Sequence, residues 1–595
     1  MRILGLVTRT HDTGVALVED GEIVMVLEEE RHSRDKHTIW FPRHALAALM
    51  GADGRGLAGI DVITTPWDQL RLRRTFANAV FSGFPASLNL IRDASHSTQD
   101  GAVVIMNTLL RMGLCRTFPA QRQPKIVAVG HHESHAAMFF VSPFDDATVI
   151  VMDGYGDDAS TSVFTGQDNH LVRQWQGSFF DSLGMVYTLV TRHLGFEVFE
   201  EGTVMALAAL GRDSLVGKMR DVLPLTPDGH FTVNMSYFGY ERYGMLRPFQ
   251  PKFVEVFGPA RQRGEPLTAH HKDLAFALQA VAEDVILHVA RSAHQRYPSR
   301  NLCLMGGVAL NCVANARLVR DSGFERIWVP PCASDTGAPL GSALYHHHQT
   351  LGEPRRAEMT HAYYGLAYSD AEIEAALTAA GMAYERLDDD TLIGKVAQDL
   401  ADGRIVGWFQ DRYEIGPRAL GNRSILASPV SSGVRDTLNH RVKFREPFRP
   451  FAPSVLAERA NEYFEIDQPD PFMTLAPRVR PHHAARIPAA VHVDGTARLQ
   501  TVAQASNPRY HALIERFGSI TGIPILLNTS FNKQEPIVAR PSEAISCFLR
   551  TQMDVLVMGN YYTTDRPEGA ALRAHSAFQA AKTVPRWGIA HHAGL

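Results

Sequence analysis

The strongest constraint on the fold of this chain is a pattern in residues 1–350, where short apolar runs of strand length end in polar turns that contain glycine. Residues 3–7 and 15–30 are typical of strands, and the Asp20-Gly21 pair favours a hairpin turn. Strands of this kind lead into helices once from the start of the chain and again from about residue 147. The sequence therefore predicts two related α/β lobes with a cleft between them, where the loops at the strand ends converge.

A second α/β domain is predicted after a break in this pattern. Helical periodicity over 268–296 predicts a long helix in the first part of the chain. Residues 351–365 are polar and punctuated by proline and glycine, which is typical of a domain linker. Helical periodicity and an apolar strand resume after residue 369. We therefore expect two domains, over residues 1–355 and 356–595.

Charge and composition narrow the classes of partner. The chain has 595 residues and a net charge of −4, whereas proteins dedicated to nucleic acids or anionic membranes usually carry a basic excess. No apolar run approaches a membrane span, and the N-terminus lacks the apolar core of a signal peptide. The five cysteines form no CxxC motif and are typical of reduced thiols. We expect a cytoplasmic protein with no nucleic-acid or membrane partner.

One segment contradicts the overall acidic balance. Between Gly416 and Ser454 there are seven basic residues and two acidic ones. Glycines, prolines and phenylalanines are interleaved with them, which favours a rigid, partly desolvated pocket for a small polyanion over a solvated basic patch or a nucleic-acid stripe. Asn528 and Ser530 would add neutral hydrogen bonds to such a ligand. The seven basic residues are Arg418, Arg423, Arg435, Arg441, Lys443, Arg445 and Arg449.

A histidine pair suggests a metal site. His131 and His135, in HHESHAA, are four residues apart and would lie on one face of a helix. Asp153 and Asp335 each follow an apolar strand in a glycine-containing loop. Together they form a mixed nitrogen and oxygen set for iron, zinc or manganese. A histidine pair alone is more often a capping or packing feature, and such aspartates alone are more often turn formers.

Two further signals are weaker. In MGGVALN, the pair Gly306-Gly307 would let the backbone approach a ligand, and a helix N-terminus directly after it would favour a phosphate. His11 lies in the loop after the first strand. It is either a turn residue or, if it faces the cleft, a general base.

In combination, these motifs resemble one family, the O-carbamoyltransferases of natural-product biosynthesis. The resemblance covers roughly residues 1–565 and depends on the order of the motifs along the chain. They are THDTGVALVEDGEIV, EEERHSRDKH, HHESHAA, MDGYGD, GTVMALAALG, MGGVALN, PPCASDTG, GPRALGNRS, VKFREPFRPFAPS, ASNPRYH and LNTSFN.

The resemblance implies two coupled sites. The first domain would have the two-lobed actin-like ATPase fold of the tRNA threonylcarbamoyladenosine transferases and would hold a metal, usually Fe²⁺. The second would have the YrdC-like α/β fold and would convert carbamoyl phosphate and ATP, with Mg²⁺, into carbamoyl-adenylate. That intermediate would pass internally to the first domain, where a hydroxyl of a small metabolite attacks it. The size of the chain is compatible with a homodimer.

The family's functional residues map onto numbered positions of this chain. The resemblance implies metal ligands, an acceptor base, an adenosine-contacting turn and a phosphate and nucleotide pocket. In that order the residues are His131, His135, Asp153 and Asp335; His11; Gly306, Gly307 and Asn311; and Arg418, Lys443, Arg449, Arg498 and Asn528. Among them, His11, Lys443 and Arg449 would take part in catalysis.

Two positions depart from the family pattern. Thr203 stands where the family often has a lysine, so the pocket there would suit a different substrate. The loop after Asn532 lacks a common Gly-Glu-Pro step and is one residue shorter, which leaves nucleotide contacts from that loop open.

Two other functions compete with this interpretation. One is a tRNA-modifying threonylcarbamoyl transferase, which the lack of a basic balance disfavours. The other is a non-catalytic actin-like nucleotide sensor, which would not need His11, His131 and His135.

Overall fold

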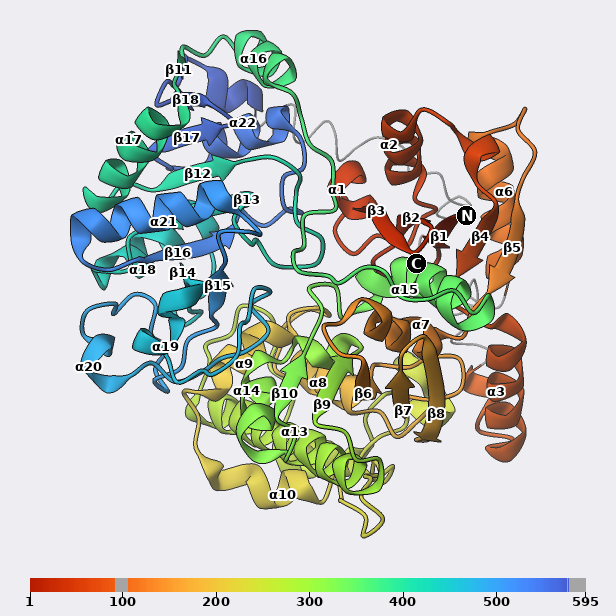
Figure 1. The fold of residues 1–595 in the computed structure, drawn as a ribbon. Helices are drawn as coiled ribbons and strands as arrows, with labels where there is room; N and C mark the ends of the chain where they lie inside the picture. The colour runs from red at the N-terminus through yellow and green to blue at the C-terminus, as the bar shows by residue number, and fades with distance from the viewer. Residues whose placement is uncertain (91–104, 575, 577–595) are drawn as a thin grey trace. The chain divides into compact units, whose positions relative to one another are not determined.

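The computed structural model describes residues 1–90, 105–574 and 576 (Figure 1). The chain divides into two compact units. The first comprises residues 1–10, 16–24 and 54–359, and the second comprises residues 11–15, 25–53 and 360–595. The N-terminal segments 11–15 and 25–53 therefore belong to the unit that is otherwise built from the C-terminal part of the chain.

The first two sheets have the same strand order. The first sheet runs β3-β2-β1-β4-β5 and the second, read from its other edge, runs β8-β7-β6-β9-β10. In the first sheet, β4 and β5 are parallel to β1, and in the second sheet, β9 and β10 are parallel to β6. The strands are β1 (Arg2–Val7), β2 (Gly14–Glu19), β3 (Glu22–Glu28), β4 (Val62–Thr65), β5 (Lys125–Ala128), β6 (Asp146–Met152), β7 (Thr161–Gln167), β8 (His170–Gln176), β9 (Asn301–Met305) and β10 (Arg326–Trp328). The prediction of two related α/β lobes, as in the actin-like ATPase fold, is confirmed by this repeated order.

Local sequence explains several of these elements. Asp20 and Gly21 join β2 to β3 with φ values of 51° and 88°, the left-handed pair that an Asp-Gly hairpin turn requires. The predicted long helix is α13, and the Thr268 side chain caps it by accepting from the backbone of His271. The helices of this part of the chain are α1 (Glu29–Ser33), α2 (Arg43–Asp53), α3 (Gln69–Ser82), α6 (Met106–Thr117), α7 (His131–Ala136), α8 (Leu183–His193), α9 (Glu201–Ala208), α10 (Val216–Arg220), α11 (Tyr240–Tyr243), α12 (Pro251–Phe257), α13 (Ala269–Arg296), α14 (Cys312–Asp321) and α15 (Ala338–Leu344).

The second unit is built on a mixed sheet in the order β11-β18-β17-β12-β13-β16-β14-β15. Helices α17 and α21 pack on it through a core that includes Trp408, Leu426 and Phe517. Its strands are β11 (Glu385–Arg386), β12 (Val406–Phe409), β13 (Arg423–Ala427), β14 (Ala452–Leu456), β15 (Gln500–Val502), β16 (Ile525–Ser530), β17 (Val555–Met558) and β18 (Tyr561–Thr563). Its helices are α16 (Asp370–Ala379), α17 (Asp389–Ala401), α18 (Gly433–Leu438), α19 (Ala460–Tyr463), α20 (Pro481–Ala484), α21 (Pro508–Thr521) and α22 (Pro541–Arg550).

The helix that carries the predicted metal ligands is seated by backbone contacts. A Cβ atom at Gly341, on α15, would lie 1.8 Å from the Ser134 carbonyl oxygen of α7. On the other side of α15, a Cβ atom at Gly5 of β1 would lie 1.9 Å from the Pro339 carbonyl oxygen. Because neither side has room for a methyl group, α15 fixes the position of α7 relative to the first sheet.

We expect Gly341→Ala to displace α7 and to lower the free energy of unfolding by about 1–3 kcal/mol, the usual cost of overpacking. Gly394→Ala in α17 is the matched control, since no atom lies within 4 Å of the added Cβ. That control should be neutral or stabilising by up to about 1 kcal/mol. Scanning calorimetry of both variants measures the difference, and equal melting temperatures would show that α15 and α7 are not tightly packed.

The segment 25–53 is bound into the second unit by buried charges. Arg31 donates to the Gly416 carbonyl oxygen at 2.7 Å and to the Glu28 carboxylate at 2.7 Å. Arg34 donates to the carbonyl oxygens of Pro536 and Ile537 at 2.5 and 2.8 Å. Guanidinium groups that satisfy backbone carbonyls in this way hold loops in fixed positions.

His32 in the same segment gives the protein a predictable pH dependence. Its side chain is buried beside the Tyr413 hydroxyl, 2.9 Å away, and burial together with Arg540 and Arg31 lowers the pKa of His32 to about 3. The unfolded chain takes up this proton at about pH 6.5, so below that pH it binds more protons than the folded state does. We expect the wild type to lose about 1.4 kcal/mol of stability by pH 5.5 through this group, and His32→Gln to remove that loss.

Denaturant unfolding of wild type and His32→Gln at pH 7.5 and 5.5 checks this expectation. His170→Gln, at an exposed position on β8, is the control and should keep the wild-type pH dependence. Parallel pH profiles for wild type and His32→Gln would contradict the buried neutral state of His32.

Candidate active site

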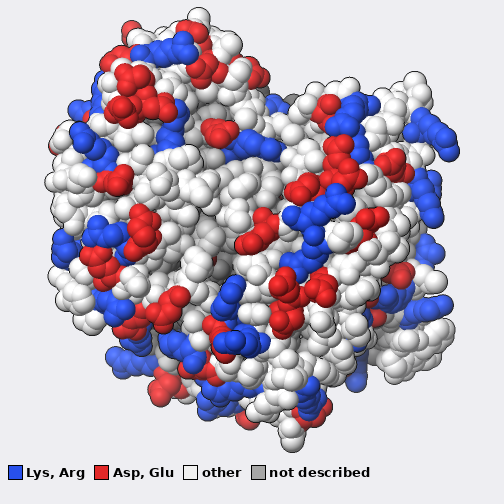
Figure 2. Space-filling model, in the orientation of Figure 1, with Lys and Arg blue, Asp and Glu red and all other residues white. Residues whose placement is uncertain are grey.

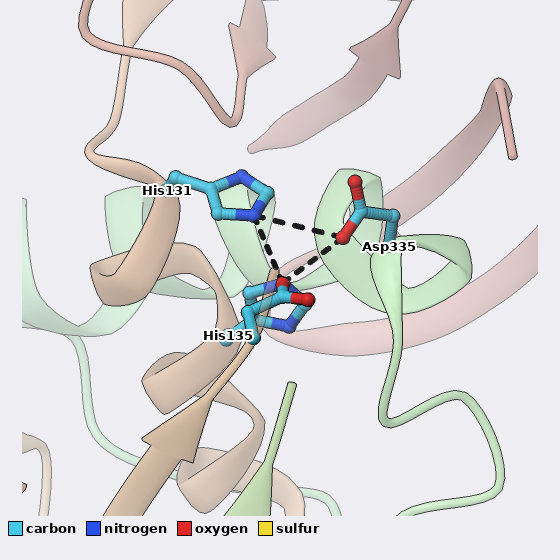
Figure 3. A group of neighbouring side chains, drawn as sticks. His131, His135 and Asp335 are labelled. Atoms are coloured by element: carbon cyan, nitrogen blue, oxygen red, sulfur yellow. Dashed lines mark hydrogen bonds and ion pairs between the residues drawn. The ribbon is translucent and has the colours of Figure 1, made fainter. Parts of the chain in front are cut away.

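The predicted metal ligands lie together in the first unit. His131 and His135 are on α7, are each 1% exposed, and place their Nε2 atoms 3.2 Å apart (Figure 3). Asp153 follows β6, and Asp335 lies in the loop after β10. Because β6, β9 and β10 are parallel, their carboxyl ends meet at one edge of the second sheet. The arrangement of the strands thus brings together residues that are far apart in the sequence.

The distances within this cluster suit a single ion. Asp153 Oδ2 lies 3.3 and 3.1 Å from the Nε2 atoms of His131 and His135, and Asp335 Oδ1 lies 3.6 and 3.3 Å from them. Ligands about 2.0–2.2 Å from a tetrahedral ion are separated by about 3.3–3.6 Å. Two imidazole nitrogens and two carboxylate oxygens, all four buried, therefore fit a divalent transition metal.

The surroundings direct the histidine lone pairs toward the centre of the cluster. His131 Nδ1 lies 3.2 Å from the Pro66 carbonyl oxygen, which fixes its proton there and leaves Nε2 free to ligate. Trp67 stacks on the His131 ring at a centroid distance of 4.1 Å. Asp157 accepts the His131 backbone N–H at 2.7 Å and so holds the start of α7. These are the outer contacts that metal-binding histidines usually have.

The cluster is also charged in the way a metal site requires. Burial alone would lower the pKa of His131, but the carboxylates of Asp335 and Asp153 outweigh it and raise the pKa. Burial would raise the pKa of Asp153, and hydrogen bonds from the two histidines lower it instead. The two carboxylates thus favour positive charge at the centre of the cluster, and a divalent ion would supply that charge to imidazoles whose Nε2 atoms carry no proton.

The glycine turn after β9 adjoins this cluster. Gly306 has φ of 88°, and a Cβ atom there would lie 2.1 Å from the Met152 carbonyl oxygen, so packing against β6 already requires glycine. The Gly307 N–H lies 3.3 Å from Asp153 Oδ1. The turn therefore supports a predicted metal ligand directly.

The helix expected directly after this turn differs from the prediction. A single 3₁₀ turn, Gly307–Leu310, comes first, and α14 begins only at Cys312. Asn311 caps α14 by accepting the Ala314 N–H at 3.1 Å, and its amide pairs with Gln279 at 2.9 and 3.0 Å. Asn311 therefore already accepts a hydrogen bond from a backbone N–H group at the N-terminus of α14. It would compete with a phosphate for the N–H groups there.

His11 belongs to the second unit and lies beside an acidic residue. Its ring is 37% exposed, and its Nδ1 atom lies 3.6 Å from Asp12 Oδ2. Asp12 in turn contacts His37, with 2.8 Å between Asp12 Oδ1 and His37 Nδ1. An imidazole with one nitrogen turned toward a carboxylate and the ring partly accessible can act as a general base.

The seven basic residues between Gly416 and Ser454 do not share one pocket. Arg423 is fully buried, stacks on Phe409 at 3.6 Å and donates to the carbonyl oxygens of Asn422 and Asp411 at 2.9 and 3.0 Å. Arg441 lies at the surface, 3.4 Å from Asp554. Their roles are structural, so the expectation that all seven face a polyanion is wrong. Tertiary packing separates them, although their sequence contexts are alike.

A smaller cationic cluster remains in the second unit. Burial lowers the pKa of Arg445 well below its usual value, and the neighbouring Arg449 and Arg498 lower it further. Burial likewise lowers the pKa of Lys443, with contributions from Arg445 and Arg449. Such mutual repulsion is relieved by a bound polyanion. Arg445 is one of the seven basic residues predicted to form a pocket, although it is not among the nucleotide-pocket residues that the resemblance implies.

Lys443 is already surrounded by acceptors. Its ammonium group donates to the carbonyl and hydroxyl oxygens of Ser530 at 2.7 and 3.0 Å, and to the carbonyl and side-chain oxygens of Asn532 at 3.0 and 2.6 Å. Lys443 therefore ties the LNTSFN segment to the cationic cluster. In this structure it orders the loop.

The other predicted pocket residues have different surroundings. Asn528 is buried in β16, and its side-chain NH₂ donates to Gln500 at 2.9 Å. Its Oδ1 atom has no hydrogen-bond partner within the described chain, which leaves one buried acceptor for a ligand N–H. Arg418 is half-buried, two residues beyond Gly416. Arg509, on α21, forms an ion pair with Asp389.

Charge on the surface is mixed. Over the described residues of the face drawn in Figure 2, Lys and Arg side chains are interspersed with Asp and Glu. A tRNA-binding protein would present a continuous basic surface. This face has no such stripe among the residues that the structure describes.

Comparison with known proteins identifies the family. The model for the carbamoyltransferase N-terminus matches residues 2–344, and the model for the carbamoyltransferase C-terminus matches residues 397–565. The chain belongs to the carbamoyltransferase family. The resemblance predicted from the motifs is therefore confirmed, and the protein is a carbamoyltransferase enzyme.

Relatives match this carbamoyltransferase over most of its length. An uncharacterised protein of Synechocystis sp. is 39% identical over 94% of this chain and 96% of its own. The nodulation protein NolNO of Sinorhizobium fredii is 37% identical over 94% of this chain and 80% of its own. The nodulation protein NolO of Bradyrhizobium diazoefficiens is 38% identical over 78% of this chain and 83% of its own. The similarity thus extends across both units.

The structure shows the surroundings of both positions at which this carbamoyltransferase departs from the family pattern. Thr203 is buried in α9, and its hydroxyl has no hydrogen-bond partner in the part of the chain that the structure covers. The short loop after Asn532 is closed by an ion pair of 2.6 Å between Glu535 and Arg550.

Within the described ranges, no helix is long and apolar enough to cross a bilayer.

Proposed function

We propose that this carbamoyltransferase uses ATP to carbamoylate a hydroxyl group of a small metabolite. In the first half-reaction, water cleaves carbamoyl phosphate to carbamate and phosphate, and a carbamate oxygen then attacks the α-phosphorus of ATP, so that pyrophosphate leaves. In the second, the acceptor oxygen bonds to the carbamoyl carbon and AMP leaves. The observation that carries this proposal is the cationic cluster of the second unit, in a chain of this family.

The cluster suits the first half-reaction. ATP and carbamoyl phosphate are both anions, so that bringing them together requires several fixed cations and Mg²⁺. Arg445, Arg449 and Arg498 repel one another in the absence of an anion. We assign them, with Arg418, to the phosphate groups. The buried acceptor of Asn528 would receive an N–H of the adenine or of the carbamoyl group. The proposed domain for this step is 356–595.

The second half-reaction is assigned to the transfer domain, 1–355. His131, His135, Asp153 and Asp335 would hold a divalent ion, with iron as the family implies. Such an ion supplies Lewis acidity toward a carbamoyl or phosphate oxygen. His11 would accept the proton of the attacking hydroxyl at Nε2. Gly306, Gly307 and Asn311 would contact the adenosine part of carbamoyl-adenylate.

One assay tests the first half-reaction without knowledge of the acceptor. Labelled pyrophosphate is incubated with protein, ATP and Mg²⁺, with and without carbamoyl phosphate. We expect label to enter ATP only when carbamoyl phosphate is present, because formation of the adenylate is reversible. No exchange, or exchange independent of carbamoyl phosphate, would overturn the proposed function.

A further inference from the structure

Two residues near His11 have strained backbone conformations. Asp12 and His37 have φ values of 61° and 51°, in the left-handed region that residues with a side chain seldom adopt. Each such residue costs about 1–3 kcal/mol and persists only where its surroundings enforce it. Strain of this kind concentrates at functional sites. The two residues are 25 positions apart, and each lies in a loop of the second unit.

These two loops are locked together by the backbone. The Thr13 N–H donates to the Thr38 carbonyl oxygen at 3.2 Å, and the Glu29 N–H donates to the Thr13 carbonyl oxygen at 2.9 Å. The His37 N–H donates to Glu30 at 3.0 Å. Asp12 and His37 are therefore held in place from both sides, and their side chains meet as a consequence.

The carboxylate of Asp12 lies between two imidazoles. One oxygen is 2.8 Å from His37 Nδ1 and the other is 3.6 Å from His11 Nδ1. Burial would raise the pKa of Asp12, but the two histidines outweigh it and lower the pKa, so the carboxylate stays ionised. The Nδ1 atom of His11 is buried, while its ring is 37% exposed. The exposed part of the His11 side chain therefore does not include Nδ1.

We propose that Asp12 positions His11 for proton transfer and that His37 holds Asp12 in the required orientation. This inference rests on the proposed function of His11. The Nδ1–H of His11 would donate to Asp12, which keeps Nε2 unprotonated and available to the acceptor hydroxyl. When the acceptor oxygen bonds to the carbamoyl carbon and AMP leaves with its electron pair, Nε2 takes the hydroxyl proton. Asp12 stabilises the imidazolium until that proton passes to solvent.

The separation of 3.6 Å is consistent with this role. It exceeds a normal hydrogen bond, and catalytic hydrogen bonds in proteins without substrate are often long and shorten in the reacting complex. A rival role exists for the same residues, since Asp12, Glu30 and His37 place ligand atoms within 4.8 Å of one another and could hold a cation. The 2.8 Å contact between Asp12 and His37 favours the positioning role, because it is shorter than the separation of about 3.3–3.6 Å between two ligands of one tetrahedral ion.

The test measures the reactivity of His11 directly. Diethylpyrocarbonate acylates unprotonated imidazole nitrogen, and peptide mass spectrometry at pH 8 gives the rate at His11, with exposed His170 as internal reference. In Asp12→Asn, the amide would donate to Nδ1 and move the ring proton to Nε2, so we expect the rate at His11 to fall by about 10-fold. Asp12→Glu should recover part of the rate, and His37→Gln should lower it less than Asp12→Asn does.

Each outcome decides the inference. An unchanged rate at His11 in Asp12→Asn, with an unchanged melting temperature, would overturn it. A loss of one equivalent of bound metal in Asp12→Asn, with His131 and His135 intact, would assign the residues to a cation instead. With an acceptor that supports transfer, Asp12→Asn should lower kcat about 10²–10⁴-fold at constant KM, and should add nothing in a His11→Ala background. Failure of pyrophosphate exchange in the wild type would remove the proposed function and leave the labelling result intact.

Discussion

A His135→Ala variant is expected to lose its divalent ion and to be inactive in carbamoyl transfer. His135 Nε2 lies 3.1 and 3.3 Å from the two carboxylate ligands, so its removal opens one corner of the four-ligand set. Loss of an outer contact to a ligand already costs about 10–100-fold in metal affinity, and loss of a ligand itself should cost more. Elemental analysis of purified protein should show about one equivalent of metal in the wild type and almost none in the variant.

The neighbouring histidine provides a matched control. His132 is on the same helix and is equally buried, but its Nδ1 atom lies 2.7 Å from the Ser162 hydroxyl and it is not in the cluster. His132→Gln should therefore retain the ion. Full occupancy in His135→Ala, or equal loss in both variants, would reject the assigned ligands. Pyrophosphate exchange should persist in His135→Ala, because we propose that the ion acts in the transfer step.

An Arg449→Ala variant is expected to lose pyrophosphate exchange by about 10²–10³-fold, the usual cost of removing one fixed donor to a developing charge. Arg449 adds positive charge beside Arg445, lies 3.9 Å from Glu446 and has a side chain that is 32% exposed, so that a ligand can reach it. Metal content should be unchanged. The loss should appear in kcat as well as in the KM for carbamoyl phosphate, because the same positive charge would stabilise both the bound substrate and the transition state.

Arg441→Ala is the control for this prediction. Arg441 comes from the same basic segment, but it is 42% exposed and is paired with Asp554. Its loss should change exchange less than twofold, since a surface ion pair contributes only about 0–1 kcal/mol. If Arg441→Ala were as inactive as Arg449→Ala, the effect would come from disruption of the segment rather than from a lost phosphate contact.

The grouping of the two histidines and two aspartates could be predicted from the sequence because its geometry is local or topological. The spacing of His131 and His135 sets their shared helix face, and the ends of apolar strands place Asp153 and Asp335 at one sheet edge. The repeated strand order could be predicted for the same reason. Strand-length apolar runs and turn residues such as Asp20-Gly21 define it.

The roles of the individual basic residues between Gly416 and Ser454 could not be predicted in the same way. Arg423 and Arg445 have similar sequence contexts and both donate to backbone carbonyl oxygens, yet Arg445 also adjoins Arg449 and Arg498. Which of them faces a ligand depends on packing between residues far apart in the chain. The coupling of Asp12 to His37 was missed because no periodicity links two loops that meet only after folding.

The membership of residues 25–53 in the second unit has a consequence for how such an enzyme can be divided. A fragment that starts at residue 356 would lack Arg31 and Arg34, and would leave the carbonyl oxygens of Gly416, Pro536 and Ile537 without their guanidinium donors. The unit that we propose to activate the carbamoyl group thus depends on a distant N-terminal segment of the chain, residues 25–53. Gene fission at the linker would separate parts that fold as one, so we expect both units to be inherited as a single polypeptide.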